Sequence, residues 1–227
     1  MMTLVLALMA EGPTDERFLP IIIQRTAEKI LRERSQFVVD VLEPIDLRKE
    51  ITPGTYKNQA ERILLAAQHA AGYHALIVHV DADNRTHDDA INERIQPGFD
   101  LVKASNNDVC TQLIPIVPIR MTEAWMLADP EAFKEVVGTD VPTRNLGLPA
   151  RPHQVEAELD PKHKLRQAIK LASASRPRRR RRRGIRLGHL YEPLARQIRL
   201  ERLSAVPAYQ RFVDDLTACL IALRLAE

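Results

Sequence analysis

The sequence predicts an α/β fold with a mainly parallel sheet flanked by helices, and three observations support this prediction. Short runs rich in Val, Ile and Leu alternate along the chain with stretches whose apolar residues recur at helical spacing. The short runs are continuously apolar, as strands buried on both faces of a sheet are. Acidic residues directly follow two of these runs, where ligands gather in sheets of this type.

The first part of the chain contains the alternating elements. Strands are expected at residues 3–9, 37–42, 75–80 and 113–119. Helices are expected after Thr14, over 57–71, from about 88 to 94 with a resumption after Pro97-Gly98, after Thr122, and over 130–137. Thr14 and Thr122 are expected to cap their helices. Pro115 and Pro118 cannot donate to a ladder, so the last strand is expected at a sheet edge or to end there.

After Gly138 the pattern changes, and two domains are predicted. Residues 1–138 would form the α/β domain, and residues 139–227 a mostly helical C-terminal extension packed on it. Prolines make 139–158 mainly irregular, a helix starts near Asp160, and Pro207 opens a last helix with an apolar stripe.

Composition predicts a protein of a reducing compartment. The 227 residues are 45% apolar, which suffices for a normal core, and the two cysteines show no metal-binding spacing. The apolar segment 1–10 lacks a basic leader and is too short for a membrane span, so it is interpreted as the first strand. A cytoplasmic protein without membrane attachment is expected, and the sequence leaves its oligomeric state open, although the last helix could serve an interface.

The positive charge of the chain is local. The net charge is +3, and without one short arginine run it would be 3 − 7 = −4. The run lies within residues 176–183 and comprises Arg176, Arg178, Arg179, Arg180, Arg181, Arg182 and Arg183. Clustered arginines bind phosphate backbones without reading sequence, which predicts contact with DNA or RNA. The alternative is a solvated loop, because blocks of like charge are usually disordered.

Acidic side chains at strand ends predict a metal site. Asp81 and Asp83 follow the run 75–80, and side chains two residues apart on a strand point the same way. Both carboxylates could then hold Mg²⁺ or Mn²⁺, which prefer oxygen ligands. Glu11 follows the first strand at a turn containing Gly12 and Pro13. Glu11 could equally be an exposed loop acid, and Glu123 could equally serve the dipole of its helix.

Several short motifs resemble a known family. Residues 11–19 (EGPTDERFL), 122–129 (TEAWMLAD) and 207–216 (PAYQRFVDDL) are similar to the bacterial DUF4276 family. Glu11-Gly12 after one strand and Asp81-x-Asp83 after another resemble the Toprim fold, a Rossmann-like fold shared with OLD-family nucleases. The resemblance implies a general acid/base role for Glu11, metal binding by Asp81 and Asp83, and Glu123 as a further candidate ligand. It also implies anti-phage defence beside an AAA/ABC-type ATPase.

The leading functional hypothesis is therefore a Mg²⁺-dependent nuclease that hydrolyses phosphodiesters. A second hypothesis is a non-catalytic binding or regulatory subunit of an ATPase complex. A third is a sugar-nucleotide transferase in which the two aspartates bind Mn²⁺ and a diphosphate, but that reaction gives no role to Glu11 or to the arginine run. A phosphatase of the haloacid dehalogenase type fits less well, since an aspartate should follow its first strand. His79 is interpreted as a packed core residue rather than a ligand.

Overall fold

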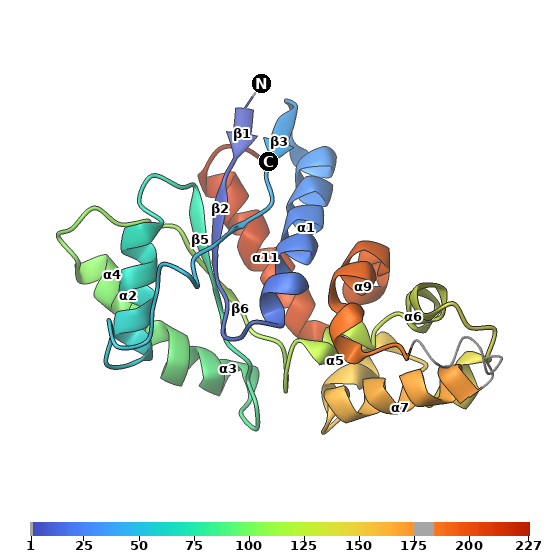
Figure 1. Cartoon of the computed structure of the whole chain (residues 1–227). Helices are drawn as coiled ribbons and strands as arrows, with labels where there is room; N and C mark the ends of the chain where they lie inside the picture. The colour runs from blue at the N-terminus through green and yellow to red at the C-terminus, as the bar shows by residue number, and fades with distance from the viewer. Residues whose placement is uncertain (1, 175–183) are drawn as a thin grey trace.

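In the computed structural model, which describes residues 2–174 and 184–227, parallel strands form the centre of the molecule (Figure 1). A sheet of order β4-β2-β5-β6 contains Ile45–Asp46, Leu6–Met9, Ala75–His79 and Leu113–Ile116. Beside it, β1 (Met2–Leu4) pairs with β3 (Val39–Val41). Every strand pair given for the described residues is parallel, which confirms the predicted α/β class. The edge position predicted for the strand containing Pro115 is also confirmed.

Helices cover both faces of this sheet. On one face lie α1 (Leu19–Arg34) and α11 (Pro207–Ala222), and on the other α2 (Gln59–His69) and α4 (Gln96–Ala104) (Figure 1). Successive side chains of a strand point to opposite faces of the sheet, so each strand contributes to both hydrophobic clusters. Leu6 and Leu8 belong to the cluster under α1, whereas Ala7 and Met9 belong to the cluster under α2. This two-sided burial explains why the strands are continuously apolar in sequence.

The C-terminal half packs on the α1 side of the sheet. Its elements are α5 (Glu123–Met126), α6 (Pro130–Val137), η3 (Thr143–Leu146), η4 (Pro152–Ala157), α7 (Pro161–Ala174), η5 (Leu187–His189), α9 (Tyr191–Gln197), α10 (Leu200–Leu203) and α11. Their apolar side chains belong to the same cluster as Leu6 and Leu8. Within it, the rings of Trp125 and Tyr209 meet edge to face with centroids 5.3 Å apart. Residues 139–227 therefore share a hydrophobic core with the first part of the chain.

The helix expected to break at Pro97-Gly98 is continuous. It runs from α3 (His87–Ala90) through η2, a π-helix over Ile91–Ile95, into α4. Pro97 is the second residue of α4, and a proline is tolerated in the first turn of a helix. A short helix, η1 (Asp15–Arg17), precedes α1. The strand β4 was not predicted, and η3 and η4 lie in the segment expected to be irregular.

The two predicted threonine caps are also corrected. Neither Thr14 nor Thr122 caps its helix with its side chain. Thr122 Oγ1 instead lies 3.3 Å from His79 Nε2, so a tertiary hydrogen bond replaces the local one. Among the helices of the described residues, none is long and apolar enough to cross a membrane.

Candidate functional site at the carboxyl edge of the sheet

Glu11 and Asp81 meet at the carboxyl edge of neighbouring strands. Because β2 and β5 are parallel partners, the residues that follow them emerge side by side. The backbone N–H of Asp81 donates to Glu11 Oε2 at 2.8 Å. Two acids 70 positions apart in sequence are therefore joined directly.

A buried histidine lies beneath these acids. His79, the last residue of β5, is fully buried, and its Nδ1 accepts the N–H of Glu11 at 3.2 Å. Its Nε2 lies 3.2 Å from Asp81 Oδ1, which also accepts the N–H of Thr122 at 3.2 Å. His79 is packed in the core, as the sequence indicated, but it also fixes the backbone of Glu11 and the carboxylate of Asp81.

Burial and charge act in opposite directions on this histidine. Burial lowers the pKa of His79, but the hydrogen bond to Asp81 and the negative charges of Asp15, Asp81 and Glu11 outweigh it, so the pKa is raised. Burial raises the pKa of the Asp81 carboxyl, although its bond with His79 offsets part of that effect. The buried carboxylate of Asp15 lies 3.8 Å from His79 Nδ1 and accepts the N–H of Gly12 at 2.9 Å. The backbone of the Glu11-Gly12 turn is thus fixed by two hydrogen bonds, one from Glu11 to His79 and one from Gly12 to Asp15.

Asp83 lies beyond the strand and does not follow the predicted alternation. β5 ends at His79, and Asp83 adopts a left-handed backbone with φ 54°. Aspartate tolerates this conformation better than most residues, and such backbone often occurs at functional positions. Asp81 is directed inward to His79 and Thr122, whereas the Asp83 side chain is 56% exposed. The expectation that both carboxylates point the same way is therefore wrong, because it assumed extended backbone through residue 83.

Arg94 connects all three acidic positions. Its Nη2 donates to Glu11 Oε1 at 2.6 Å, and its Nη1 donates to the carbonyl oxygen of Asp81 at 2.5 Å and to Asp83 Oδ2 at 3.4 Å. Arg94 lies in the π-helix η2, and its side chain is 21% exposed. The guanidinium thus lies between carboxylates that come from the ends of two strands. No sequence pattern near Arg94 predicted this position.

Glu123 lies close to this edge but has other partners. The residue is 1% exposed, and its carboxylate accepts the hydroxyl of Tyr191 and lies 3.2 Å from Lys162 Nζ of α7. Burial and the Glu123 carboxylate raise the pKa of Tyr191 far above its usual value, so the tyrosine remains a neutral donor. The structure therefore brings Glu11, Asp81 and Asp83 together through Arg94 and ties Glu123 to the C-terminal helices.

The acidic side chains at this edge carry the oxygen ligands that a hard divalent cation prefers. Glu11, Asp81 and Asp83 offer carboxylate oxygens, and the Arg94 guanidinium already takes the place of a cation between two of them. As they stand, no three His, Cys, Asp or Glu side chains in residues 2–174 and 184–227 lie together as a metal-holding group. The arginines predicted to bind nucleic acid, Arg176 and 178–183, lie outside the described residues.

Fold and site together define an α/β protein with an acidic cluster and one arginine at the carboxyl edge of a parallel sheet. Its family is also identified: the model for "Domain of unknown function (DUF4276)" matches residues 10–217, and the chain belongs to that family. Searches of curated proteins and of solved structures found no significant match.

Proposed function

We propose that this protein is a Mg²⁺- or Mn²⁺-dependent nuclease of the Toprim type that hydrolyses phosphodiester bonds. The observation that carries the proposal is the meeting of Glu11 with Asp81 and Asp83 at the carboxyl ends of two adjacent parallel strands, held by one guanidinium. Carboxylates in this position suit a divalent cation and phosphate chemistry.

Each acid would have a separate role in this reaction. Asp81 and Asp83 would hold the cation, which when bound polarises a phosphoryl oxygen and offsets the developing negative charge. Glu11 would either move the proton of the attacking water or the leaving oxygen, or join Asp81 and Asp83 in holding the cation. The bond from the Asp81 N–H to Glu11 Oε2 fixes that carboxylate in place, so little ordering would be required during the reaction. Glu123 would support the site through the C-terminal helices, because its carboxylate is paired with Tyr191 and Lys162.

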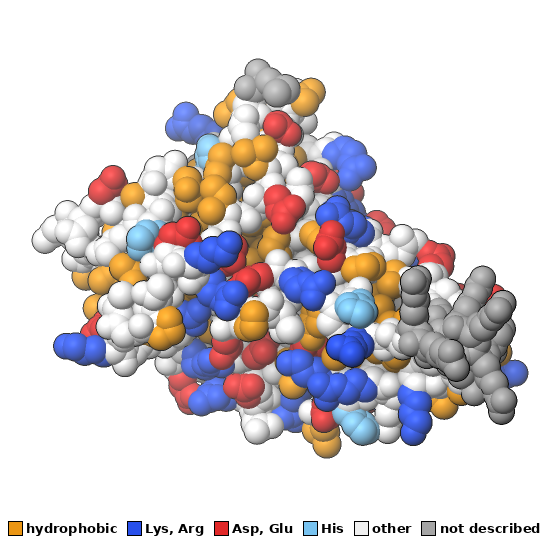
Figure 2. Space-filling view, in the orientation of Figure 1, with side chains coloured by type: hydrophobic (Ala, Val, Ile, Leu, Met, Phe, Trp, Pro, Cys, Tyr) orange, Lys and Arg blue, Asp and Glu red, His pale blue; other side chains and the backbone are white. Residues whose placement is uncertain are grey.

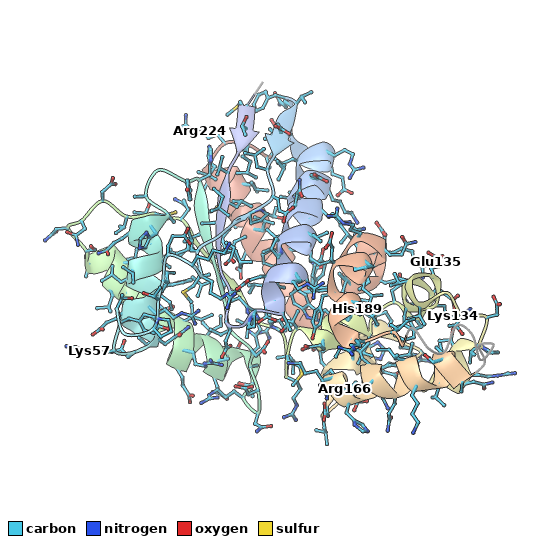
Figure 3. The ribbon with its side chains drawn as sticks, in the orientation of Figure 1. Lys57, Lys134, Glu135, Arg166, His189 and Arg224 are labelled. Atoms are coloured by element: carbon cyan, nitrogen blue, oxygen red, sulfur yellow. The ribbon has the colours of Figure 1, made fainter. Side chains whose placement is uncertain are left out.

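A basic surface lies beside this edge and supports a nucleic-acid substrate. Lys and Arg side chains gather around α7 on the visible face of the molecule (Figure 2). Arg166 of α7 and His189 of η5 lie on this face (Figure 3), and the two elements are in contact. Lys162, on the same helix, reaches Glu123. The arginine run 176–183 follows α7 directly in sequence, so phosphate contacts would extend from there.

The test is cleavage by the purified full chain. Plasmid, single-stranded DNA and total RNA are incubated with Mg²⁺, Mn²⁺ or EDTA. The variants Glu11→Gln, Asp81→Asn and Asp83→Asn are expected to lose about 100-fold or more of the metal-dependent rate. Asp40→Asn is the control, because Asp40 is an exposed carboxylate in β3, away from the carboxyl edge of β2 and β5. Cleavage that persists in EDTA, or in all three site variants, would contradict the proposal.

A non-catalytic subunit is the second candidate, and Arg94 is the observation that favours it. The guanidinium neutralises Glu11 and Asp83 within the chain, so the site is stable without any metal. In this alternative the protein would bind or regulate an ATPase in an anti-phage defence system. Co-expression with any AAA/ABC-type ATPase that is encoded beside it, followed by the same cleavage assay with ATP, separates the two. Stable co-purification without cleavage would favour the subunit.

A further inference from the structure

We infer that Arg94 is a built-in counter-cation which a divalent metal ion must displace before the site can work. The inference rests on the proposed function, since it concerns the metal site of that reaction. Within the described residues, the Arg94 side chain donates its hydrogen bonds to Glu11, Asp81 and Asp83. It bonds no other element among the described residues, so its contacts serve this edge of the sheet alone.

The charges require competition between the arginine and a metal ion. A guanidinium is permanently charged and cannot lose its proton in a protein. Its nitrogens take Oε1 of Glu11 and Oδ2 of Asp83, oxygens that a divalent cation would also take. Two cations bound to the same carboxylates repel each other strongly at such short separations. Metal binding and the present position of Arg94 therefore exclude each other.

The surrounding structure allows Arg94 to move. Its side chain is 21% exposed and that of Asp83 is 56% exposed, so the guanidinium has a path to solvent. Its backbone is π-helical, a conformation that occurs mainly as short segments and frequently at functional sites. Buried Arg62 differs from it: Arg62 Nη2 donates to the carbonyl oxygen of Ala10 at 2.7 Å and Arg62 packs over the Tyr56 ring.

The first experiment measures Mn²⁺ affinity of the full chain by calorimetry, with no substrate present. Arg94→Gln is expected to bind Mn²⁺ about tenfold more tightly than wild type, because the binding-competent state no longer competes with an internal ion pair. Arg120→Gln is the matched control: Arg120 donates to the Asp83 carbonyl oxygen at 3.2 Å and to Asn84 Oδ1, but to no carboxylate of the described residues. Its affinity should stay within about twofold of wild type.

A second measurement uses wild-type protein alone and so does not depend on how the variants fold. Phenylglyoxal modifies accessible arginines, and peptide mapping assigns the modified positions. Saturating Mn²⁺ should raise modification at Arg94 several-fold and leave Arg62 unchanged.

The outcomes separate the inference from the proposed function. Wild-type protein that binds Mn²⁺ while Arg94→Gln binds it equally or more weakly, or labelling of Arg94 that does not rise, overturns the displacement of Arg94 and leaves the metal site standing. No Mn²⁺ binding by wild type or by Arg94→Gln removes the metal site itself, and the inference with it.

Discussion

At the scale of single residues, Asp129 is the most completely bonded acid in the described structure. It is fully buried, and Arg199 donates to both carboxylate oxygens, at 2.8 Å from Nε and 2.6 Å from Nη2. Burial alone would raise the pKa of Asp129, but the bonds from Arg199 and Ala132 outweigh it, so the pKa is lowered. The ion pair between Asp129 and Arg199 therefore connects the start of α6 to the start of α10.

Replacing this carboxylate is expected to destabilise the fold in a pH-dependent way. Asp129→Asn should cost about 2 kcal/mol of unfolding free energy at pH 7, since it removes charge-assisted hydrogen bonds. A lowered pKa contributes stability above the ordinary value of 3.8 that is lost as pH falls through the folded-state value. The gap between wild type and variant should therefore narrow below about pH 4. Urea unfolding at pH 7 and pH 3.5 measures it, with exposed Asp140→Asn as control. A gap that widens in acid would refute the assignment.

Tyr191 provides a second residue-scale prediction, at the contact between Glu123 and the C-terminal helices. Tyr191→Phe leaves a carboxylate that is 1% exposed with Lys162 as its remaining charged partner. The expected loss is about 2 kcal/mol of unfolding free energy, because the buried charge loses a strong donor. Tyr73→Phe is the control, as its hydroxyl has no hydrogen bond given within the described residues. Equal stability of the two variants would mean that the Tyr191 hydroxyl does not hold Glu123.

The sequence could predict the acids of the site but not the residues that organise them. Glu11 and Asp81 were identifiable because parallel strands bring their carboxyl ends to one edge. Asp83 was placed at the right edge but in the wrong direction, because an aspartate without a neighbouring glycine is only a weak signal for the left-handed backbone found there. Arg94 and Thr122 were missed as partners, since their contacts depend on how separate elements dock against the sheet. His79 was identified as buried, but its two polar bonds were not visible in sequence.

At the scale of elements, β2 and β5 were predictable because burial on both faces makes them continuously apolar. The single strand expected at residues 3–9 is instead divided at Val5 into β1 and β2, which belong to two different sheets. The strand β4 was missed because Ile45–Asp46 is too short for any periodicity. The helix expected to break at Pro97-Gly98 was mispredicted because Pro97 lies in the first turn of α4, where a proline is tolerated, and the π-helix η2 joins α4 to α3 without a break. Errors thus occur where local backbone departs from the two regular periods on which pattern analysis depends.

Gly98 gives a prediction at this scale, because it sets the approach of α4 to α2. A Cβ added there would lie 2.6 to 2.9 Å from three atoms of Ile63, including its Cβ at 2.7 Å. Alanine would gain about 1 kcal/mol in helix propensity, but overpacking costs about 1–3 kcal/mol. Since the clash involves an atom close to the backbone, Gly98→Ala should lower unfolding free energy by about 1–2 kcal/mol in thermal or urea denaturation. Gly184→Ala, where an added Cβ meets nothing within 4 Å, is the control. A neutral Gly98→Ala would show that the two helices separate freely.

At the scale of the whole molecule, the C-terminal helices share the core of the α/β part. One cluster contains Leu6 and Leu8 of the sheet, Trp125 of α5, and Tyr209 and Phe212 of α11. The hydroxyl of Tyr209 also lies 2.8 Å from Thr26 Oγ1 on α1, a buried contact between residues 183 positions apart. Residues 139–227 thus complete the layer that covers one face of the sheet, so separating them at residue 138 would expose that face.

This shared core predicts one cooperative unfolding transition. Trp125 is the single tryptophan, it is fully buried, and its ring meets Tyr209 of α11, so its fluorescence reports contact between the two parts of the chain. Urea curves from Trp125 fluorescence and from far-ultraviolet circular dichroism should have the same midpoint and slope.

The fragment 1–138 should be insoluble or bind a dye for exposed apolar surface, whereas the full chain should not. If the fluorescence transition preceded the loss of helix, or if the fragment folded alone, the extension would be a separate unit docked on a self-sufficient domain. Metal binding at Glu11, Asp81 and Asp83 would then depend on the first part of the chain only. With a shared core, a substitution in α11 that populates the unfolded state should lower the apparent affinity of the proposed Mn²⁺ site in proportion to the fraction unfolded, because the ion would bind only the folded chain.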